Sequence, residues 1–259
     1  MCTLAVLHRC TPDARLWIAA NRDEYLERAS EAPRVRAGRG APIVAPLDLR
    51  AGGTWWGLSR EGVFAAVTNR PTAALDPARR SRGQLVVDVL AAPSARLAAE
   101  SAVGIGEDVY NPFNLLLADA RDAFVVVYEG RPRLVHLEPG VHVIGNVDPD
   151  AREVAKVRRT FAQAEAVAKG PAGSIEAGLA EICRTHADPP DARASTCIHG
   201  DVYGTRSSTL LRLGSAGDIL RHADGPPCTT PYRDFTPLLA ELDHAVGSRV
   251  GELAERKAS

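Results

Sequence analysis

The sequence predicts an α+β protein in which antiparallel sheets carry helices on their outer faces. Short apolar runs bounded by Gly, Pro and Asp recur along the chain, as expected of strands and turns. Segments with apolar residues at helical spacing separate groups of these runs. The chain has 259 residues, of which 45% are hydrophobic and 24% charged, which is typical of a globular enzyme. No internal repeat or linker interrupts it, so we expect a single domain over residues 1–259.

Two hairpins are expected in the first part of the chain. The first joins Thr3–His8 to Leu16–Ala20, and the second joins Trp56–Ser59 to Val63–Thr68. The segment 30–54 between them is rich in Pro, Gly and Arg. That composition predicts an irregular connection.

Helices and further strands alternate in the rest of the chain. Helical spacing predicts helices over Ser81–Leu90, Leu97–Val103, Asp150–Lys169, Ile175–His186 and roughly residues 236–256. Short apolar runs predict an antiparallel meander of Asn114–Ala118, Phe124–Tyr128, Arg133–Leu137 and Val141–Ile144. A last hairpin is expected from Ser208–Leu213 and Asp218–Arg221.

Charge and cysteine content argue against several classes of function. The 31 basic and 32 acidic residues nearly cancel, which gives no support for a nucleic-acid partner. No apolar run reaches the ~18 residues of a membrane span, and no signal peptide is recognised. The five cysteines include no pair at the C-x₂-C spacing. We therefore expect no disulfide framework and a reducing, cytoplasmic location.

No cofactor or metal is expected from local motifs. A Walker A loop, a dinucleotide fingerprint and an H-E-x-x-H motif are all missing from the sequence. Cys197 and His199 are separated by one residue, a spacing that fits no usual metal site. The pair is therefore interpreted as structural.

Cys2 is the first candidate for chemistry. Removal of Met1, which a small second residue favours, would leave a thiol and a free α-amine on one carbon. These groups titrate near ~8.5 and ~8, so the amine can exchange a proton with the thiol as in N-terminal nucleophile hydrolases. The alternative is that a cysteine at this position is incidental.

Asn21-Arg22-Asp23-Glu24 follows the end of a predicted strand, where site residues are often found. Asp23 is a candidate to orient the Cys2 amine, and Arg22 is a candidate to favour the thiolate. One close cation shifts a pKa by ~1–3 units, enough to lower a thiol from ~8.5 to roughly 6–7. Alternatively, Asp23 caps a helical turn and Arg22 pairs with Glu24 in solvent.

Other polar and aromatic residues lie at or near predicted strand ends. Trp55 and Trp56 point to opposite faces of a strand, so at most one indole lines a given pocket. Asn69 and Asn146 each end a strand and are candidate oxyanion donors or turn residues. Arg206 lies among small hydroxyl residues, a pattern that suits anion binding or the covering of a sheet edge.

These segments together carry a family resemblance over roughly residues 1–235. They are Met1-Cys2-Thr3-Leu4, Asn21-Arg22-Asp23-Glu24, Gly53-Thr54-Trp55-Trp56-Gly57, Thr68-Asn69-Arg70, Ser81-Arg82-Gly83, Gly145-Asn146 and Tyr203-Gly204-Thr205-Arg206-Ser207-Ser208-Thr209. They resemble the NRDE family, also called the transport and Golgi organisation protein 2 family. More distantly, the pattern is similar to the cholylglycine-hydrolase and penicillin V acylase branch of the N-terminal nucleophile hydrolases. That likeness implies a four-layer αββα sandwich.

The distant likeness also implies roles for individual residues. Cys2, Asp23, Asn69, Asn146 and Arg206 fall, in order, where that branch has its nucleophile and catalytic partners. We expect substrate contacts from Asn21, Arg22, Trp55, Trp56, Arg70 and Tyr203. The implied activity is hydrolysis or acyl transfer at an amide bond of a small, anionic, amphipathic substrate. The branch also has Arg three residues before its Asp, a position held here by Ala20, and Arg22 is the candidate substitute.

The family resemblance implies a second class of function, namely haem or lipid handling without catalysis. His8, His199 and Cys2 are the candidate haem ligands, although none lies in a haem motif. A third possibility is a protein that keeps the fold without the chemistry.

Overall fold

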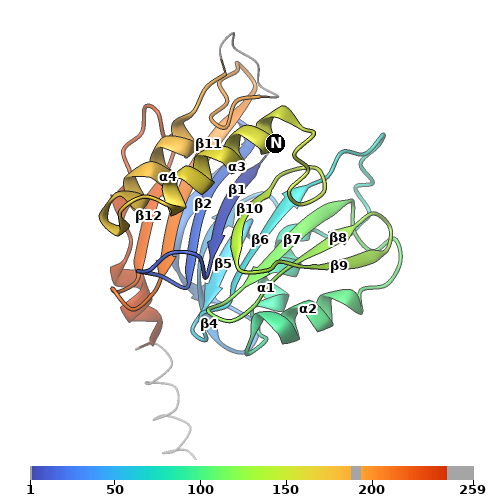
Figure 1. Ribbon diagram of the computed structural model, residues 1–259. Helices are drawn as coiled ribbons and strands as arrows, with labels where there is room; N and C mark the ends of the chain where they lie inside the picture. Colours follow the sequence, from blue (N-terminus) through green and yellow to red (C-terminus); the bar gives the residue numbers. More distant parts are fainter. Residues whose placement is uncertain (1, 188–193, 244–259) are drawn as a thin grey trace, which may run out of the picture.

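The structure is a computed structural model that describes residues 2–187 and 194–243. These residues form a six-stranded and a seven-stranded antiparallel sheet, with helices packed against both (Figure 1). The α+β class expected from the sequence is confirmed, because apolar runs and helical segments assemble into layers as predicted.

The six-stranded sheet holds the start of the chain in its interior. Its strand order is β10-β1-β2-β11-β12-β13. The strands are β1 (Thr3–His8), β2 (Leu16–Tyr25), β10 (Gly140–Ile144), β11 (Tyr203–Leu213), β12 (Ile219–Ala223) and β13 (Arg233–Asp234). Strand β1 is paired on both sides, with Thr3 opposite Asn21 of β2 and Leu4 opposite Ile144 of β10. This register fixes where Cys2 lies.

The seven-stranded sheet follows chain order from β3 to β9. Its strands are β3 (Ser30–Ala37), β4 (Pro42–Asp48), β5 (Trp56–Ser59), β6 (Phe64–Asn69), β7 (Phe113–Ala118), β8 (Ala123–Tyr128) and β9 (Pro132–His136). Each strand pairs with its neighbour in the sequence. Most of these pairs are therefore joined by short turns.

Two strand expectations were wrong. Residues 30–54 contain strands β3 and β4 rather than an irregular connection. Strand β3 lies at the sheet edge, contains Pro33 and is mostly half-exposed, so its sequence lacks a clear apolar alternation. The strand at 141–144 exists as part of β10, but it pairs with β1 in the other sheet instead of ending the meander.

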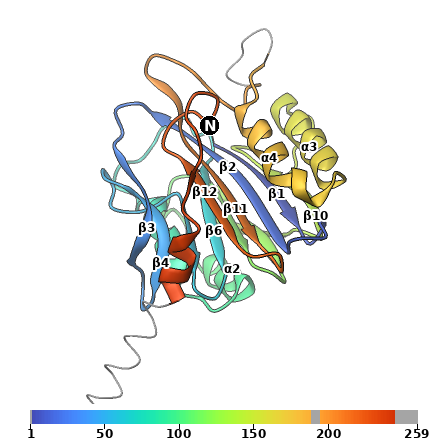
Figure 2. The ribbon, with the colours of Figure 1, turned by 90° about the vertical axis from the view of Figure 1, so that its left-hand side faces the viewer.

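Four α-helices cover the outer faces of the two sheets. They are α1 (Arg82–Val89), α2 (Ala95–Val103), α3 (Ala155–Ala168) and α4 (Ile175–Arg184). Helices α1 and α2 pack on the seven-stranded sheet, and α3 and α4 pack on the six-stranded sheet. Figure 2 shows α3 and α4 on one side of the six-stranded sheet and strands β3 and β4 on its other side. The layers therefore follow the order helix, sheet, sheet, helix.

Helix α3 begins later than the sequence pattern predicts. Asp150 has a positive φ of 58°, which an α-helical residue does not adopt. Its carboxylate instead accepts a hydrogen bond of 2.7 Å from the backbone N–H of Val143. Near the end of the chain, residues 237–243 are helical, and the rest of the helix expected over 236–256 lies outside the described residues.

The largest core lies between the two sheets. Side chains alternate along β1 and β2, so one set faces the opposite sheet and the other faces the helices. The inward set of these strands is Leu4, Val6, Leu16, Ile18 and Ala20, and the outward set is Ala5, Leu7, Trp17 and Ala19. The alternation decides which polar residues at the strand ends point into the space between the sheets.

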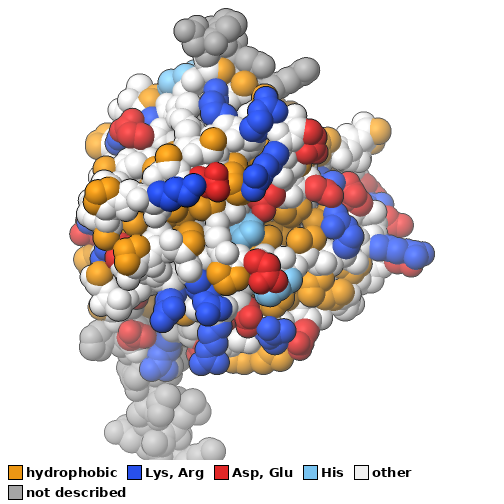
Figure 3. Space-filling model, viewed as in Figure 1, with side chains coloured by type: hydrophobic (Ala, Val, Ile, Leu, Met, Phe, Trp, Pro, Cys, Tyr) orange, Lys and Arg blue, Asp and Glu red, His pale blue; other side chains and the backbone are white. Residues whose placement is uncertain are grey.

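The surface shows no segregation of charge on the face seen in Figure 3. Basic and acidic side chains are mixed across that face. Among the described residues, no helix has both the length and the apolar character that a membrane span requires.

Gly53 is required where the chain passes the start of α1. A Cβ atom at this position would lie 2.4 Å from the carbonyl carbon of Gly83, and the next residue, Thr54, donates a backbone hydrogen bond of 3.0 Å to Gly83. We expect Gly53→Ala to lower the free energy of unfolding by about 1–3 kcal/mol through overpacking, measured by urea denaturation.

Gly173→Ala is the matched control, because a Cβ atom there meets nothing within 4 Å. Equal stability of the two variants would show that the contact between residues 53 and 83 relaxes without cost.

Candidate active site

Cys2 borders two adjoining cavities at one end of the sandwich. The larger has a volume of about 480 Å³ and the smaller of about 190 Å³. Both are lined by Cys2, Asp23 and Asn69. The thiol therefore lies where a small cavity and a larger pocket meet.

The smaller cavity brings together residues that are far apart in the sequence. It is lined by Cys2, Asp23, Asn69, Arg70, Pro71, Asn146 and Tyr203. They come from the ends of four strands, β2, β6, β10 and β11, and from the residue before β1. Four of the five residues expected to be catalytic thus line one cavity.

Asp23 is held by groups on β11 and α3. The hydroxyl of Thr205 donates a hydrogen bond of 2.6 Å to its Oδ1, and the Lys156 ammonium lies 3.9 Å from its Oδ2. Burial raises the pKa of the Asp23 carboxyl, and the Lys156 charge acts in the opposite direction. Lys156 itself is only 7% exposed, and burial lowers the pKa of its ammonium. The pair is a buried, charge-compensated unit.

The Cys2 thiol is close to the backbone of Asp23. Its Sγ lies 3.9 Å from the Asp23 carbonyl oxygen, which also accepts a hydrogen bond of 2.9 Å from the Tyr203 hydroxyl. Burial raises the pKa of the Cys2 thiol, and the charge of Arg22 lowers it by less. Arg22 thus favours the thiolate as expected, but burial has the larger effect on the pKa of the thiol.

Asn146 is fixed by a hydrogen-bonded turn that links the two sheets. Its Nδ2 donates to the backbone carbonyl of Asn69 at the end of β6. The flanking carbonyls of Gly145 and Val147 accept hydrogen bonds of 3.0 and 2.7 Å from the buried Asn114 side chain. An amide nitrogen carries two hydrogens, so one donor of Asn146 remains for another acceptor.

Arg22 lies between Trp55 and the rest of the larger pocket. Its guanidinium stands 4.2 Å from the centre of the Trp55 ring, and only 5% of the residue is exposed. Arg22 is two residues after Ala20, so the two side chains occupy the same face of β2. An arginine shifted by two positions therefore still points into the space between the sheets.

The larger pocket carries an excess of arginine. Its charged lining residues are Arg22, Arg28, Arg50, Arg79, Arg80, Arg82, Asp23, Glu24, Asp48 and Asp76. Arg28 is neutralised by Glu24 at 3.1 Å and by Asp48 at 2.5 Å. Within residues 2–187 and 194–243, Arg22, Arg50 and Arg82 form no ion pair with a carboxylate.

Burial also lowers the pKa of the Arg22 and Arg82 guanidinium groups. A lowered pKa means that these cations lack the opposite charge that would compensate for their lost hydration. An anion in the pocket would supply that charge.

Three expected site residues are not brought to the cavities. The Asn21 amide faces outwards and donates hydrogen bonds to the carbonyls of Cys183 and Thr196 at 2.8 and 3.0 Å. Trp56 is 1% exposed and stacks on Phe64 in the core, with ring centres 5.9 Å apart. Arg206 lies in a β-bulge between Thr205 and Ser207 and lines neither cavity.

Arg70 reaches the smaller cavity but is occupied by other groups. Its guanidinium pairs with Glu129 and Asp148, each at 2.8 Å, and donates to Asn114 at 3.2 Å. These contacts tie Arg70 to the turn that positions Asn146. A contact between Arg70 and substrate stays a prediction.

The three expected haem ligands do not converge. His8 is 1% exposed at the other end of β1 from Cys2, roughly 20 Å away at ~3.3 Å per strand residue. His199 lies next to Cys197 and Cys228 instead. Haem binding stays a prediction that this arrangement of ligands does not support.

Lys156, Thr205 and Asn114 were missed by the sequence analysis. Lys156 occupies the buried stripe of α3 together with Val157 and Thr160. A lysine at such a position, in a chain with only three lysines, is a signal that could have identified it. The other two carry no comparable local signal, because polar residues on strands are common.

The comparison with known families assigns the chain. The sequence pattern of the family described as Transport and Golgi organisation 2 matches residues 1–220. The chain belongs to this family. The human Transport and Golgi organization protein 2 homolog is 29% identical over 233 residues, which cover 79% of this chain and 84% of the relative. The homolog from Bos taurus is 30% identical over 235 residues with the same coverage.

Solved structures show that the fold is that of N-terminal nucleophile hydrolases. A Caenorhabditis elegans N-acylethanolamine-hydrolyzing acid amidase ortholog matches with a TM-score of 0.54 and 13% identity, over 81% of this chain and 92% of that one. The C2A mutant of the conjugated bile acid hydrolase from Clostridium perfringens matches with a TM-score of 0.56 and 10% identity, over 92% and 93%. The expected αββα fold and the family resemblance are both confirmed.

We expect Asn114→Ala to disturb the Asn146 turn. The substitution leaves the Val147 carbonyl without its side-chain donor, whereas the Thr68 hydroxyl still donates to the Gly145 carbonyl. We expect a cost of about 1–3 kcal/mol for the buried unsatisfied group. Urea denaturation should show this loss.

The control is Thr72→Ala, whose exposed hydroxyl donates only to the Ala74 carbonyl, and we expect it to be nearly neutral. If Asn114→Ala retained wild-type stability, the turn would not depend on that side chain.

Proposed function

We propose that the protein is an N-terminal cysteine hydrolase or acyltransferase acting on the amide bond of a small, anionic, amphipathic substrate. The observation that carries the proposal is the convergence of Cys2, Asp23, Asn69 and Asn146 on one cavity. Support also comes from the structural neighbours, which are named as an N-acylethanolamine-hydrolyzing amidase and a conjugated bile acid hydrolase. One name describes the hydrolysis of N-acylethanolamines, and the other describes the hydrolysis of conjugated bile acids.

The first half of the reaction forms an acyl-enzyme. After Met1 is removed, the α-amine of Cys2 accepts the thiol proton, and the sulfur attacks the carbonyl carbon of the substrate. A C–S bond forms and the carbonyl oxygen becomes an oxyanion. The remaining Nδ2 hydrogen of Asn146 and a donor from Asn69 stabilise this charge, at roughly 3 kcal/mol per donor.

The second half releases both products. The oxyanion collapses, the C–N bond breaks, and the Cys2 ammonium gives its proton to the leaving amine. Water then attacks the thioester, its proton passes to the α-amine, and cleavage of the C–S bond restores the thiol and frees the acid. An amine acceptor in place of water would give acyl transfer by the same steps.

The raised pKa of the Cys2 thiol fits a mechanism in which the α-amine of the same residue accepts the thiol proton. A buried neutral thiol is unreactive until its proton has an acceptor on the same residue. Asp23 is assigned to hold the α-amine, and it is itself fixed by Thr205 and Lys156. Arg206 keeps its expected role near the site as a further prediction, although it lines neither cavity.

The larger pocket suggests the class of substrate. Arg22, Arg50 and Arg82 are cations without a carboxylate partner among the described residues. Trp55 adds an aromatic wall beside them. An amphipathic amide with an apolar chain and a carboxylate or a similar anion would satisfy both features.

We expect Cys2→Ala to abolish turnover and labelling by a thiol-reactive acylation probe. Intact mass should show a wild-type chain without Met1, and peptide mapping should place the probe on residue 2. N-dodecanoyl glutamate and the neutral N-dodecanoyl ethanolamine serve as test substrates, with released amine measured in both cases. Faster release from the anionic compound is expected.

Cys10→Ala is the matched control and should keep both labelling and turnover. A mature chain that retains Met1, or a Cys2→Ala variant with wild-type turnover, would rule out the mechanism.

We expect Lys156→Met to move the acidic limb of the kcat/KM profile to higher pH. The Lys156 charge lowers the pKa of Asp23 against the effect of burial. Without this cation the pKa of Asp23 rises further, so the carboxylate is protonated, and the amine released, at a higher pH than in the wild type. The measurement is a pH–rate profile with circular dichroism to verify folding.

The exposed Lys169, at the end of the same helix, provides the control variant Lys169→Met. An unchanged profile in folded Lys156→Met protein would contradict a role for this lysine in positioning the charge of Asp23.

A further inference from the structure

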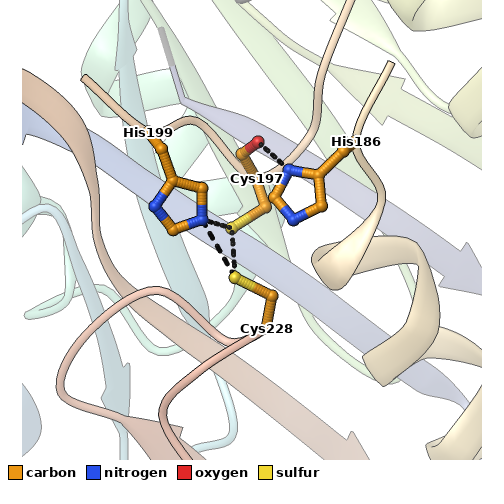
Figure 4. Close-up of side chains that lie close together, drawn as sticks. All are labelled: His186, Cys197, His199 and Cys228. Carbon is orange, nitrogen blue, oxygen red and sulfur yellow. Dashed lines mark hydrogen bonds between the residues drawn. The ribbon is translucent and has the colours of Figure 1, made fainter. Parts of the chain in front are cut away.

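Two cysteines and two histidines gather on the loops beside β11, outside the cavities at Cys2. They are His186, Cys197, His199 and Cys228 (Figure 4). His186 follows α4, Cys197 and His199 lie on the segment leading into β11, and Cys228 lies on the loop between β12 and β13. Segments that precede β11 and follow β12 therefore contribute to one cluster.

The distances within this Cys/His cluster are close to those of a tetrahedral site. The four possible ligand atoms all lie within 4.8 Å of one another. The two sulfur atoms are 3.6 Å apart, and the Nε2 of His199 lies 3.8 Å from the sulfur of Cys197 and 3.0 Å from that of Cys228. Bonds of ~2.3 Å to sulfur and ~2.0–2.1 Å to nitrogen imply tetrahedral edges of about 3.8 Å between sulfurs and about 3.6 Å between sulfur and nitrogen.

His186 has the tautomer that a metal ligand requires. Its Nδ1 lies 3.1 Å from the backbone carbonyl of Cys197. A carbonyl can only accept a hydrogen bond, so Nδ1 carries the proton and Nε2 presents its lone pair. A histidine whose second nitrogen is held by a backbone carbonyl is the usual arrangement around a bound metal.

A disulfide does not explain the cluster. The sulfur atoms of Cys197 and Cys228 are 3.6 Å apart, whereas a disulfide bond measures ~2.05 Å. Two thiolates and two imidazoles form a donor set of the kind that selects zinc. The set is complete with protein ligands alone, which is the pattern of a structural rather than a catalytic zinc site.

We propose that His186, Cys197, His199 and Cys228 bind one zinc ion that joins the start of β11 to the loop after β12. This site lies apart from the candidate active site, since none of its ligands lines either cavity.

The zinc site would support the position of Asp23. Ile198, between two of the ligands, donates a backbone hydrogen bond of 2.9 Å to the Thr205 hydroxyl and accepts one of 2.9 Å from the Thr205 N–H. The same hydroxyl donates to Asp23. The metal would thus hold the strand that carries the partner of Asp23.

The test measures metal in the full-length, untagged protein. Inductively coupled plasma mass spectrometry should find one zinc per wild-type chain, and Cys228→Ser and His199→Asn should each lose most of it. Cys10→Ser and His136→Asn are matched controls, because these residues lie outside the cluster, and both should retain the metal. Wild-type protein with no more zinc than Cys228→Ser would overturn the proposal.

A second measurement covers variants that fail to fold. Metal-free wild-type protein is titrated with Co²⁺, which should give the thiolate charge-transfer and d–d bands of a tetrahedral site. Added zinc should then protect Cys197 and Cys228, but not Cys10, from alkylation. Three results would overturn the proposal. The first is the lack of these bands, and the second is a Cys197–Cys228 disulfide in unreduced peptide maps. The third is a failure to bind zinc together with a Soret band on adding haem that depends on His199.

Discussion

The antiparallel register of β1 between β2 and β10 is the constraint on which the candidate site depends. Thr3 lies opposite Asn21 and Leu4 lies opposite Ile144. Continuing both ladders by one or two residues brings Cys2 level with Arg22 on one side and with Asn146 on the other. A slip of one residue would exchange the two faces of the strand, and the thiol would then point at the helices instead of the pocket.

Side chains alternate along β2, so the neighbouring residues Arg22 and Asp23 point to opposite faces of the sheet. Arg22 faces the space between the sheets, where it meets Trp55 and the arginine-rich pocket. Asp23 reaches the Lys156 ammonium of α3 and the Thr205 hydroxyl. A buried carboxylate and ammonium offset each other's loss of hydration, and removing one partner typically costs about 3–5 kcal/mol. Arg22 thus supplies a cation to the larger pocket, and Asp23 supplies the carboxylate that is assigned to hold the Cys2 α-amine.

The spacing of apolar residues was enough to predict most of the strands and helices. The order of the layers came from the likeness to a known fold. Strands β1, β5, β6, β7 and β8 have clear apolar runs and were placed within a residue or two of their observed ends. Strand β3 was missed because its edge position leaves it half-exposed, and the partner of β10 could not be deduced because strand pairing is a tertiary property. Asn69 and Asn146 were found because each ends a strand. Asn114 and the Cys/His cluster were not found, because their partners lie on distant segments.

Trp55 differs from the other two tryptophans of the chain. Trp17 and Trp56 are each 1% exposed in the core, whereas Trp55 forms part of the pocket wall beneath Arg22. Indole emission responds to the polarity around the ring and to a nearby cation. The fluorescence of Trp55 should therefore report whether the pocket is filled. The emission of Trp17 and Trp56 should stay constant, because both rings lie in the core.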